Sequence, residues 1–179
     1  MKKLLLIVTV ISINSISFSQ YCISGGPTTL EDSNIESFTL NGASGSINFT
    51  GCPSTTGVQE FLGQTAFLNA GGNYTANIQF GTCLGNYSGV GEAWIDYNQN
   101  GQFEASERLG QIAIAAAGTT GNIVFKIPYT AESGITRMRV RTESYNSTGE
   151  NACGNSNYGE IEDFSVNIAP APLMVLNNT

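Results

Sequence analysis

The chain of 179 residues contains no histidine and few basic residues. Seven Lys and Arg stand against 14 Asp and Glu, and the formal net charge is −7. Without histidine, neither a Ser–His–Asp triad nor a Cys–His pair can form, which excludes the commonest nucleophilic hydrolase mechanisms. Nucleic acids and anionic membrane surfaces are disfavoured as partners because both require basic patches. The acidic balance is instead compatible with the binding of cations.

Apolar runs long enough to cross a membrane are also lacking. Residues 1–19 have the pattern of a secretory signal peptide: Lys2 and Lys3 form a basic start, residues 4–11 form an apolar core, and a small-x-small cleavage site ends at Ser19. The apolar core is too short to span a bilayer. We therefore predict a secreted mature chain without a membrane span, located outside the cell, on its surface or in the periplasm.

Helical periodicity is lacking as well, whereas Gly, Ser, Thr and Asn are abundant. Alternation of apolar and polar residues is clearest at 74–80 and 164–168. Short strands separated by turns predict an all-β fold, an antiparallel β-sandwich of jelly-roll type with eight or nine strands. This domain would fill residues 20–169, and 170–179 would be a linker or truncated tail. The strands are expected at residues 35–40, 46–49, 60–68, 74–80, 91–96, 109–115, 121–127, 136–142 and 161–168.

The four cysteines are Cys22, Cys52, Cys83 and Cys153. None of them are in C-x-x-C spacing, and without histidine a zinc site has few ligands to draw on. In an exported chain they predict two structural disulfides. Three pairings are open, and sequence order alone favours Cys22–Cys52 together with Cys83–Cys153.

One loop carries the most specific motif in the chain. It starts at Asp96 and reads DYNQNGQFEASE, which fits the calcium-loop template D-x-[DN]-x-[DN]-G-x5-E at every specified position. Calcium takes roughly six to eight hard oxygen ligands, which such a loop can supply from side chains and one backbone carbonyl. The alternative is a polar turn that binds nothing. The predicted ligands are Asp96, Asn98, Asn100, Gln102 (by its carbonyl), Glu104 and Glu107.

The residues around this loop read as strands, whereas an EF-hand requires flanking helices. A calcium ion here would therefore stabilise a connection between two strands rather than open a pair of helices. Three acidic and two neutral amide side chains in the loop predict the modest affinity that is typical of extracellular modules.

A second charged pattern lies further along the chain. The strand expected at 136–142 carries three arginines on one face, alternating with apolar residues. If the strand expected at 161–168 lies beside it, its acidic residues can form a charge ladder that fixes the register, worth about 0.2–1 kcal/mol per pair. An acidic-ligand site or a carboxylate pair for glycoside cleavage is the functional alternative. The ladder would comprise Arg137, Arg139, Arg141, Glu160, Glu162 and Asp163.

Three blocks together resemble the GEVED domain family of secreted Bacteroidetes proteins. The family motif Gly-Glu-Val-Glu-Asp appears as Gly159-Glu160-Ile161-Glu162-Asp163, with a conservative Ile for Val. The calcium-type loop with the preceding Trp94-Ile95 and the arginine block at 137–141 stand in the family's order, and the resemblance covers residues 21–168. It implies an extracellular β-sandwich module, often joined to peptidase, adhesin or other surface domains, and it implies no catalytic activity.

These features predict a secreted, calcium-stabilised, non-catalytic binding or adhesion module with an extracellular protein or a glycan as its partner. Calcium would be its cofactor, and nucleic acid is not expected as a ligand. A carbohydrate-binding module is the sharper alternative, because sugars stack on exposed aromatic rings. The tyrosines expected in loops or at strand ends are Tyr87, Tyr97, Tyr145 and Tyr158.

Two further alternatives remain. An accessory domain of a secreted peptidase rests on the family resemblance alone. A carboxylate-based glycoside hydrolase would use Asp96, Glu160 or Glu162. These residues are also claimed by the calcium loop and the charge ladder, and a carboxylate engaged in either cannot readily act as an acid or base.

Overall fold

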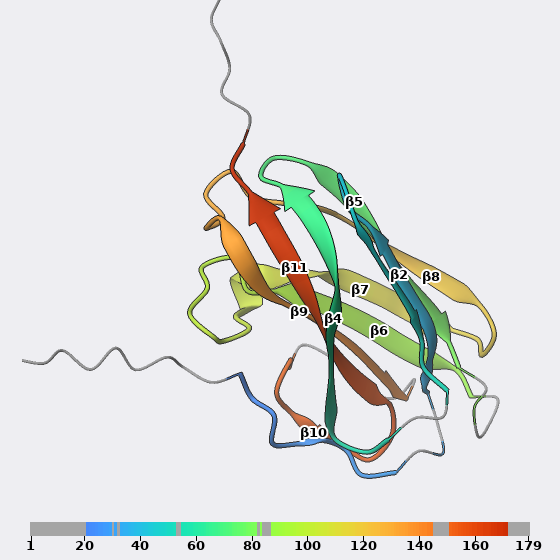
Figure 1. Cartoon of the computed structure of the whole chain (residues 1–179). Helices are drawn as coiled ribbons and strands as arrows, with labels where there is room; N and C mark the ends of the chain where they lie inside the picture. Colours follow the sequence, from blue (N-terminus) through green and yellow to red (C-terminus); the bar gives the residue numbers. More distant parts are fainter. Residues whose placement is uncertain are drawn as a thin grey trace, which may run out of the picture.

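The computed structural model describes residues 21–29, 31, 33–52, 55–81, 83, 87–144 and 151–171, without the side chains of 114 and 115. The predicted signal peptide, Tyr145 and most of the predicted tail lie outside these residues. The described part consists of two stacked sheets and a small third sheet at one end (Figure 1).

Each predicted strand is present, with ends that differ by at most two residues. Two very short strands and a 3₁₀ turn were not predicted. The elements are β1 Gly26–Pro27, β2 Ile35–Asn41, β3 Ser46–Thr50, β4 Val58–Asn69, β5 Asn73–Phe80, β6 Gly89–Ile95, η1 Ala105–Glu107, β7 Arg108–Ala115, β8 Thr120–Lys126, β9 Gly134–Ser144, β10 Asn155–Ser156 and β11 Glu160–Ala169.

The five-stranded sheet has the order β4-β11-β9-β6-β7, and the four-stranded sheet has the order β3-β2-β5-β8. The all-β class is confirmed, but a purely antiparallel arrangement is wrong. Strand β4 pairs with β11 in parallel, as β1 does with β10. Parallel neighbours need a long crossover, and the many residues between β4 and β11 provide one. Alternation of residue types shows which face is buried but does not show the direction of pairing.

The core lies between the two large sheets. Along β5, Ala76, Ile78 and Phe80 are fully buried, as alternation predicts. The rings of Phe38 in β2 and Phe164 in β11 stack across the interface with centroids 4.7 Å apart. The main apolar cluster therefore joins both sheets.

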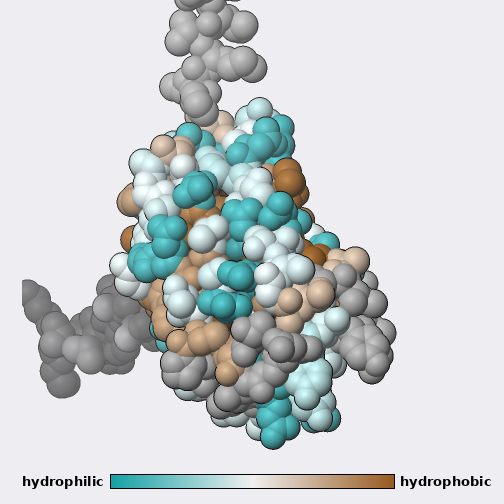
Figure 2. Space-filling model, turned by 90° about the vertical axis from the view of Figure 1, so that its right-hand side faces the viewer, coloured by the Kyte–Doolittle hydropathy of each residue, from teal (hydrophilic) through white to brown (hydrophobic). Residues whose placement is uncertain are grey.

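The outer faces of the two sheets differ. Figure 2 shows that the side of the molecule carrying β2, β5 and β8 is mostly hydrophilic, with separate small apolar spots. In the other sheet every residue of β6 is buried, so both of its faces are covered there. Among the described residues, no helix is long and apolar enough to cross a membrane.

The two predicted disulfides are present, but their pairing is Cys22–Cys153 and Cys52–Cys83. The pairing favoured by sequence order is wrong. Cys52 and Cys83 follow β3 and β5. Both strands run antiparallel to β2, so they run in the same direction and finish at the same end of the sheet. Cys22 and Cys153 belong to segments that pack over the outer face of the five-stranded sheet.

Candidate functional site

The calcium-type loop connects β6 to β7, which are antiparallel neighbours. It is the yellow-green loop that projects beyond these strands in Figure 1. The strands on both sides are those expected from the sequence, so this is a connection between strands. The 3₁₀ turn η1 forms its last residues.

Asp96 is fully buried at the start of the loop. Its Oδ2 accepts hydrogen bonds from the Gly101 amide (2.9 Å) and the Tyr21 hydroxyl (2.7 Å). Its Oδ1 accepts one from the Asn100 amide at 3.2 Å. Gly101 has φ +78°, a left-handed conformation that glycine adopts without strain. The loop thus folds back onto its first carboxylate.

Glu107 closes the loop from its other end. Its Oε1 accepts hydrogen bonds from the amides of Tyr97 (2.7 Å) and Asn98 (3.2 Å), and its Oε2 accepts one from Glu104 (3.1 Å). Burial raises the pKa of Glu107, the three backbone donors lower it, and the nearby Asp96 carboxylate raises it further. The first and last positions of the motif therefore lie close enough to repel each other electrostatically.

The remaining predicted ligands converge at the rim of the loop. Asn98 Nδ2 and Asn100 Nδ2 each donate to the Glu104 carboxylate at 3.2 Å. The oxygens of the same two amides accept hydrogen bonds from the backbone of Asn100 (3.0 Å) and Gln102 (2.8 Å). The side chains that are predicted to bind calcium are thus linked to one another and to the loop backbone by hydrogen bonds.

The donor set of this loop consists of oxygen atoms only, which suits a hard cation such as calcium better than a transition metal. In the part of the chain that the structure describes, no three Asp, Glu, Cys or His side chains form a metal-binding group by themselves. An ion held here would therefore also depend on the amide oxygens of Asn98 and Asn100 and on the Gln102 carbonyl.

The arginine strand β9 pairs with β11, as predicted, in an antiparallel register that places Arg139 opposite Asp163. Arg139 Nε donates to Asp163 Oδ1 at 2.7 Å and its Nη2 to Oδ2 at 2.8 Å. Both side chains are fully buried. Arg137 also contacts Asp163, at 3.3 Å, and pairs with Glu60 of β4. Arg141 pairs with Glu143. A bidentate buried pair is thus the centre of this charged face.

Two carboxylates of the predicted ladder lie elsewhere. Glu162 is opposite Val140 and Glu160 is opposite Thr142. Because side chains alternate along a strand, these two glutamates share the inner face with Val140, away from the arginines. The prediction that they meet the arginine face is wrong, and Asp163 takes that place. A shift of one residue in register exchanges the faces.

Residues 91–167 match the GEVED domain. The chain contains a GEVED domain. The matched segment runs from β6 to β11 and includes all three blocks on which the resemblance was based, although it starts later than the expected residue 21. No curated protein matches the chain.

The name-giving motif of the GEVED domain combines three structural roles. Gly159 has φ +114°, and a Cβ there would lie 2.0 Å from the Thr142 carbonyl oxygen, so only glycine fits this approach. Glu160 and Glu162 then enter the inner face, and Asp163 points to Arg139 on the outer face. The motif therefore fixes how β11 joins β9.

The inner pair of the GEVED motif is fully buried. Glu160 Oε2 accepts a hydrogen bond from the Ile35 amide at 2.7 Å, which links β11 to the start of β2. Within the described residues no backbone or cationic donor reaches the oxygens of Glu162, and its side-chain neighbour is the Glu160 carboxyl group. Burial, and then the neighbouring Glu160 carboxylate, raise the pKa of Glu162 far above its ordinary value. The protonated, neutral form of Glu162 is thereby favoured in the folded chain.

The arginine face is covered by the segments that the Cys22–Cys153 disulfide joins. Arg139 Nη2 donates to the Cys22 carbonyl at 2.9 Å, and Nη1 to the Ala152 carbonyl at 2.8 Å. Arg141 Nη1 donates to the Gly154 carbonyl at 2.9 Å. The guanidinium groups therefore donate to backbone carbonyls of these covering segments as well as to carboxylates of the sheet. We call the segments around Cys22 and Cys153 the cover of the arginine face.

Two aromatic residues connect this covered face to the calcium-type loop. The Phe103 ring of the loop lies 4.7 Å from the Arg139 guanidinium, and the Tyr21 ring lies 4.4 Å from that of Arg137. Tyr21 also donates to Asp96, and its burial and this carboxylate raise its pKa to about 12. Tyr21 belongs to no motif, and Phe103 occupies a position of the calcium-loop template at which no residue type is specified, so sequence reasoning missed both.

The predicted aromatic platforms are only partly exposed. Tyr87 and Tyr158 leave 52% and 38% of their surface exposed. Tyr97 is buried in the main core cluster, so its prediction as a sugar platform is wrong. Tyr145 lies outside the described residues. Trp94 is buried too, but it lies opposite Arg139, on the covered outer face.

Proposed function

We propose that this chain is an extracellular, non-catalytic binding module whose GEVED domain is stabilised by calcium at the Asp96–Glu107 loop. The observation that carries the proposal is the closure of this loop by its first and twelfth residues. Asp96 and Glu107 are buried, and every predicted side-chain ligand between them belongs to the same hydrogen-bonded loop.

A cation in the loop would relieve a repulsion that exists without it. Asp96 raises the pKa of Glu107, so the two carboxylates lie within electrostatic reach of each other. A bound calcium ion supplies positive charge between such ligands. The loop residue Phe103 and the Asp96 partner Tyr21 both contact the arginine face. Ion binding would therefore stabilise the cover of the five-stranded sheet as well as the loop.

The absence of catalysis is part of the proposal. Its support is that the carboxylates left for acid–base chemistry, Glu160 and Glu162, are fully buried in the interior of the sandwich, where a substrate has no access. Asp96 is engaged by Tyr21 and by loop amides. The extracellular setting is supported by the two disulfides, which form and persist in oxidising compartments.

The test is thermal unfolding of the chain purified after export, in calcium and in excess chelator. Calcium at a hundred times its dissociation constant stabilises by about 2.7 kcal/mol. For a domain of this size the midpoint should rise by roughly 5–10 °C. An unchanged midpoint would reduce the loop to a polar turn.

Glu104→Gln is the sharpest variant for this test. Glu104 is exposed, and glutamine keeps its shape while removing one ligand charge. In chelator the variant should lose little stability, because glutamine keeps one of the two oxygens that accept from Asn98 and Asn100 at this exposed site. It should gain less stability from calcium than the original chain does. The matched control is Glu132→Gln, which removes an equal charge from an exposed residue outside the loop and should leave the calcium effect unchanged.

A further inference from the structure

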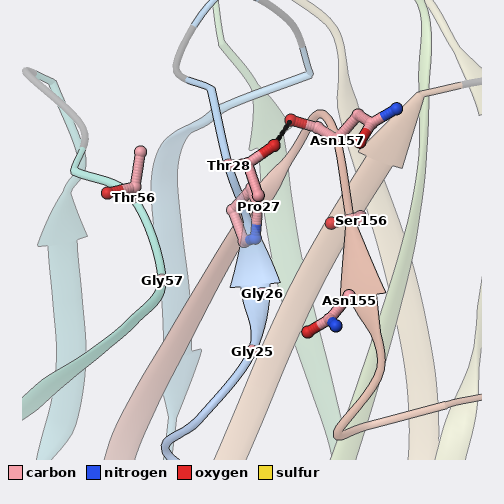
Figure 3. Close-up of a pocket in the computed structure, with 9 residues that line it drawn as sticks. All are labelled: Gly25, Gly26, Pro27, Thr28, Thr56, Gly57, Asn155, Ser156 and Asn157. Atoms are coloured by element: carbon pink, nitrogen blue, oxygen red, sulfur yellow. Dashed lines mark hydrogen bonds between the residues drawn. The ribbon is translucent and has the colours of Figure 1, made fainter.

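A groove of about 800 Å³ lies at the end of the molecule that carries the small β1–β10 sheet. Figure 3 shows β1 between the segment that contains Thr56 and Gly57 and the segment 155–157. The first of these segments directly precedes β4, and the second includes β10. The groove belongs neither to the calcium-type loop nor to the arginine face.

The backbone of the groove is held together by hydrogen bonds. Thr29 N donates to the Asn157 carbonyl at 3.0 Å, and Gly57 N donates to the Pro27 carbonyl at 3.0 Å. The Cys22–Cys153 disulfide joins the segments that lead into β1 and β10. The three segments around the groove are therefore held together by backbone hydrogen bonds and a disulfide. A ligand in the groove would be bound by their side chains.

Glycines allow these segments to approach closely. Gly26 has φ +89°, and a Cβ there would lie 3.0 Å from the Gly57 backbone. A Cβ at Gly25 would lie 2.7 Å from Asn155 Oδ1. In Figure 3 the Asn155 carboxamide extends towards Gly25, which directly precedes β1. Small residues thus make room for polar groups beside β1.

The chemistry of the groove is polar and neutral. Its side chains are hydroxyls, carboxamides and one proline, and none of the lining residues is charged, although the chain has a net charge of −7. A phosphate, carboxylate or ammonium ligand would find no counter-charge here. Ser156 Oγ is buried and lacks a hydrogen-bond partner among the described residues. Hydroxyls and carboxamides both donate and accept, so they suit a ligand that does the same.

We propose that this groove binds a neutral carbohydrate chain, an inference that rests on the binding-module function proposed above. Sugar hydroxyls donate and accept hydrogen bonds without charge, which matches the side chains of Thr28, Asn155 and Asn157. Tyr158, which directly follows Asn157 and keeps 38% of its surface exposed, is not among the residues that line the groove, so the proposal rests on the hydroxyl and carboxamide groups.

The test is an NMR titration of the exported chain with four neutral hexasaccharides, made of β-1,4-linked glucose, xylose, mannose or N-acetylglucosamine. At least one should shift the amide signals of residues 25, 26, 28, 56–57 and 155–157. The double variant Asn155→Ala with Asn157→Ala should weaken that binding by about fivefold or more, since each lost hydrogen bond contributes about 0.5–1.5 kcal/mol. Thr56→Arg should weaken it independently by filling the groove.

The matched control is Asn122→Ala, an exposed asparagine on β8 of the other large sheet. It should leave affinity unchanged, and an equal loss there would overturn the proposal. Signals that stay unshifted with all four sugars would also overturn it. A neutral Gly-Ser peptide that shifts these amides when no sugar does would assign the groove to peptides instead. Sugar binding without a calcium effect on unfolding would reject calcium stabilisation alone, and a calcium effect without sugar binding would reject the groove alone.

Discussion

The two faces of β11 carry neighbouring carboxylates that are stabilised in different ways. On the outer face, Asp163 forms a bidentate ion pair with Arg139, under the cover that the Cys22–Cys153 disulfide joins. On the inner face, Glu162 lies beside Glu160 with no cationic partner among the described residues. All of these carboxylates are buried.

This contrast shows that the group beside a buried carboxyl side chain decides how the cost of its burial is offset. Removal from water disfavours the charged form, and a close guanidinium compensates for that cost at Asp163. At Glu162 the neighbouring group is another acid, so protonation compensates instead. Burial and the neighbouring Glu160 thus raise the pKa of Glu162, whereas the next residue, Asp163, lies in an ion pair with Arg139.

The largest effect should come from breaking the outer ion pair. Asp163→Asn removes the charge that balances the buried Arg139 and should destabilise the chain by about 3–5 kcal/mol. Urea unfolding at neutral pH measures it. Glu60→Gln is the control, because Glu60 is an exposed partner of Arg137 and such pairs contribute about 1 kcal/mol or less. Similar losses of stability for both variants would show that the buried Arg139–Asp163 pair contributes no more than the exposed Arg137–Glu60 pair.

The raised pKa of Glu162, which lies beside Glu160 on the inner face, should make the stability of the chain depend on pH. The pKa of Glu162 is raised on folding, so the folded chain keeps a proton that the unfolded chain releases above the ordinary value of about 4.3. Stability should therefore be highest below that value and fall as pH rises towards the raised pKa. The slope is at most about 1.4 kcal/mol per pH unit.

Glu162→Gln tests this assignment because it mimics the protonated side chain at every pH. Urea unfolding in chelator between pH 5 and 8 should show a smaller loss of stability for this variant than for the original chain. Glu132→Gln, at an exposed position, should keep the original slope. A Glu162→Gln slope equal to the original would show that the inner pair is not held protonated.

The smallest effect should come from the cover of the outer face. Tyr21→Phe keeps the ring over Arg137 but removes the hydrogen bond to Asp96, and should cost about 1–2 kcal/mol. Tyr129→Phe is the matched control, because Tyr129 is 69% exposed and stacks on Lys126. Chemical denaturation in chelator compares the two. Equal stability of Tyr21→Phe and the original chain would mean that this contact does not hold the cover in place.

Local patterns predicted much of this arrangement. Alternation indicated the strands at 74–80 and 164–168, because a half-buried strand repeats every two residues, and short segments between turn residues indicated the others. The residues on both sides of Asp96–Glu107 predicted a connection between two strands, which the structure has. The motif blocks identified the GEVED domain, which the match over residues 91–167 confirms. Each of these features depends on residues close together in the chain.

The errors concern partners that are distant in the chain. The disulfides join Cys22 to Cys153 and Cys52 to Cys83 because packing brings these segments together. Tyr21 meets Asp96 across 75 positions, and no local pattern marks such a contact. The parallel pairing of β4 with β11 was missed for the same reason.

The sequence by itself determined which segments form strands, which loop has calcium-type spacing and which domain family the chain carries. Only the tertiary structure decided that Asp163 rather than Glu162 meets Arg139, and that a neutral groove forms between β1, β10 and the start of β4. The physical reason is register. Side-chain identity is local, but the face of a sheet to which a side chain points is set by how distant strands pair, and a shift of one residue reverses it.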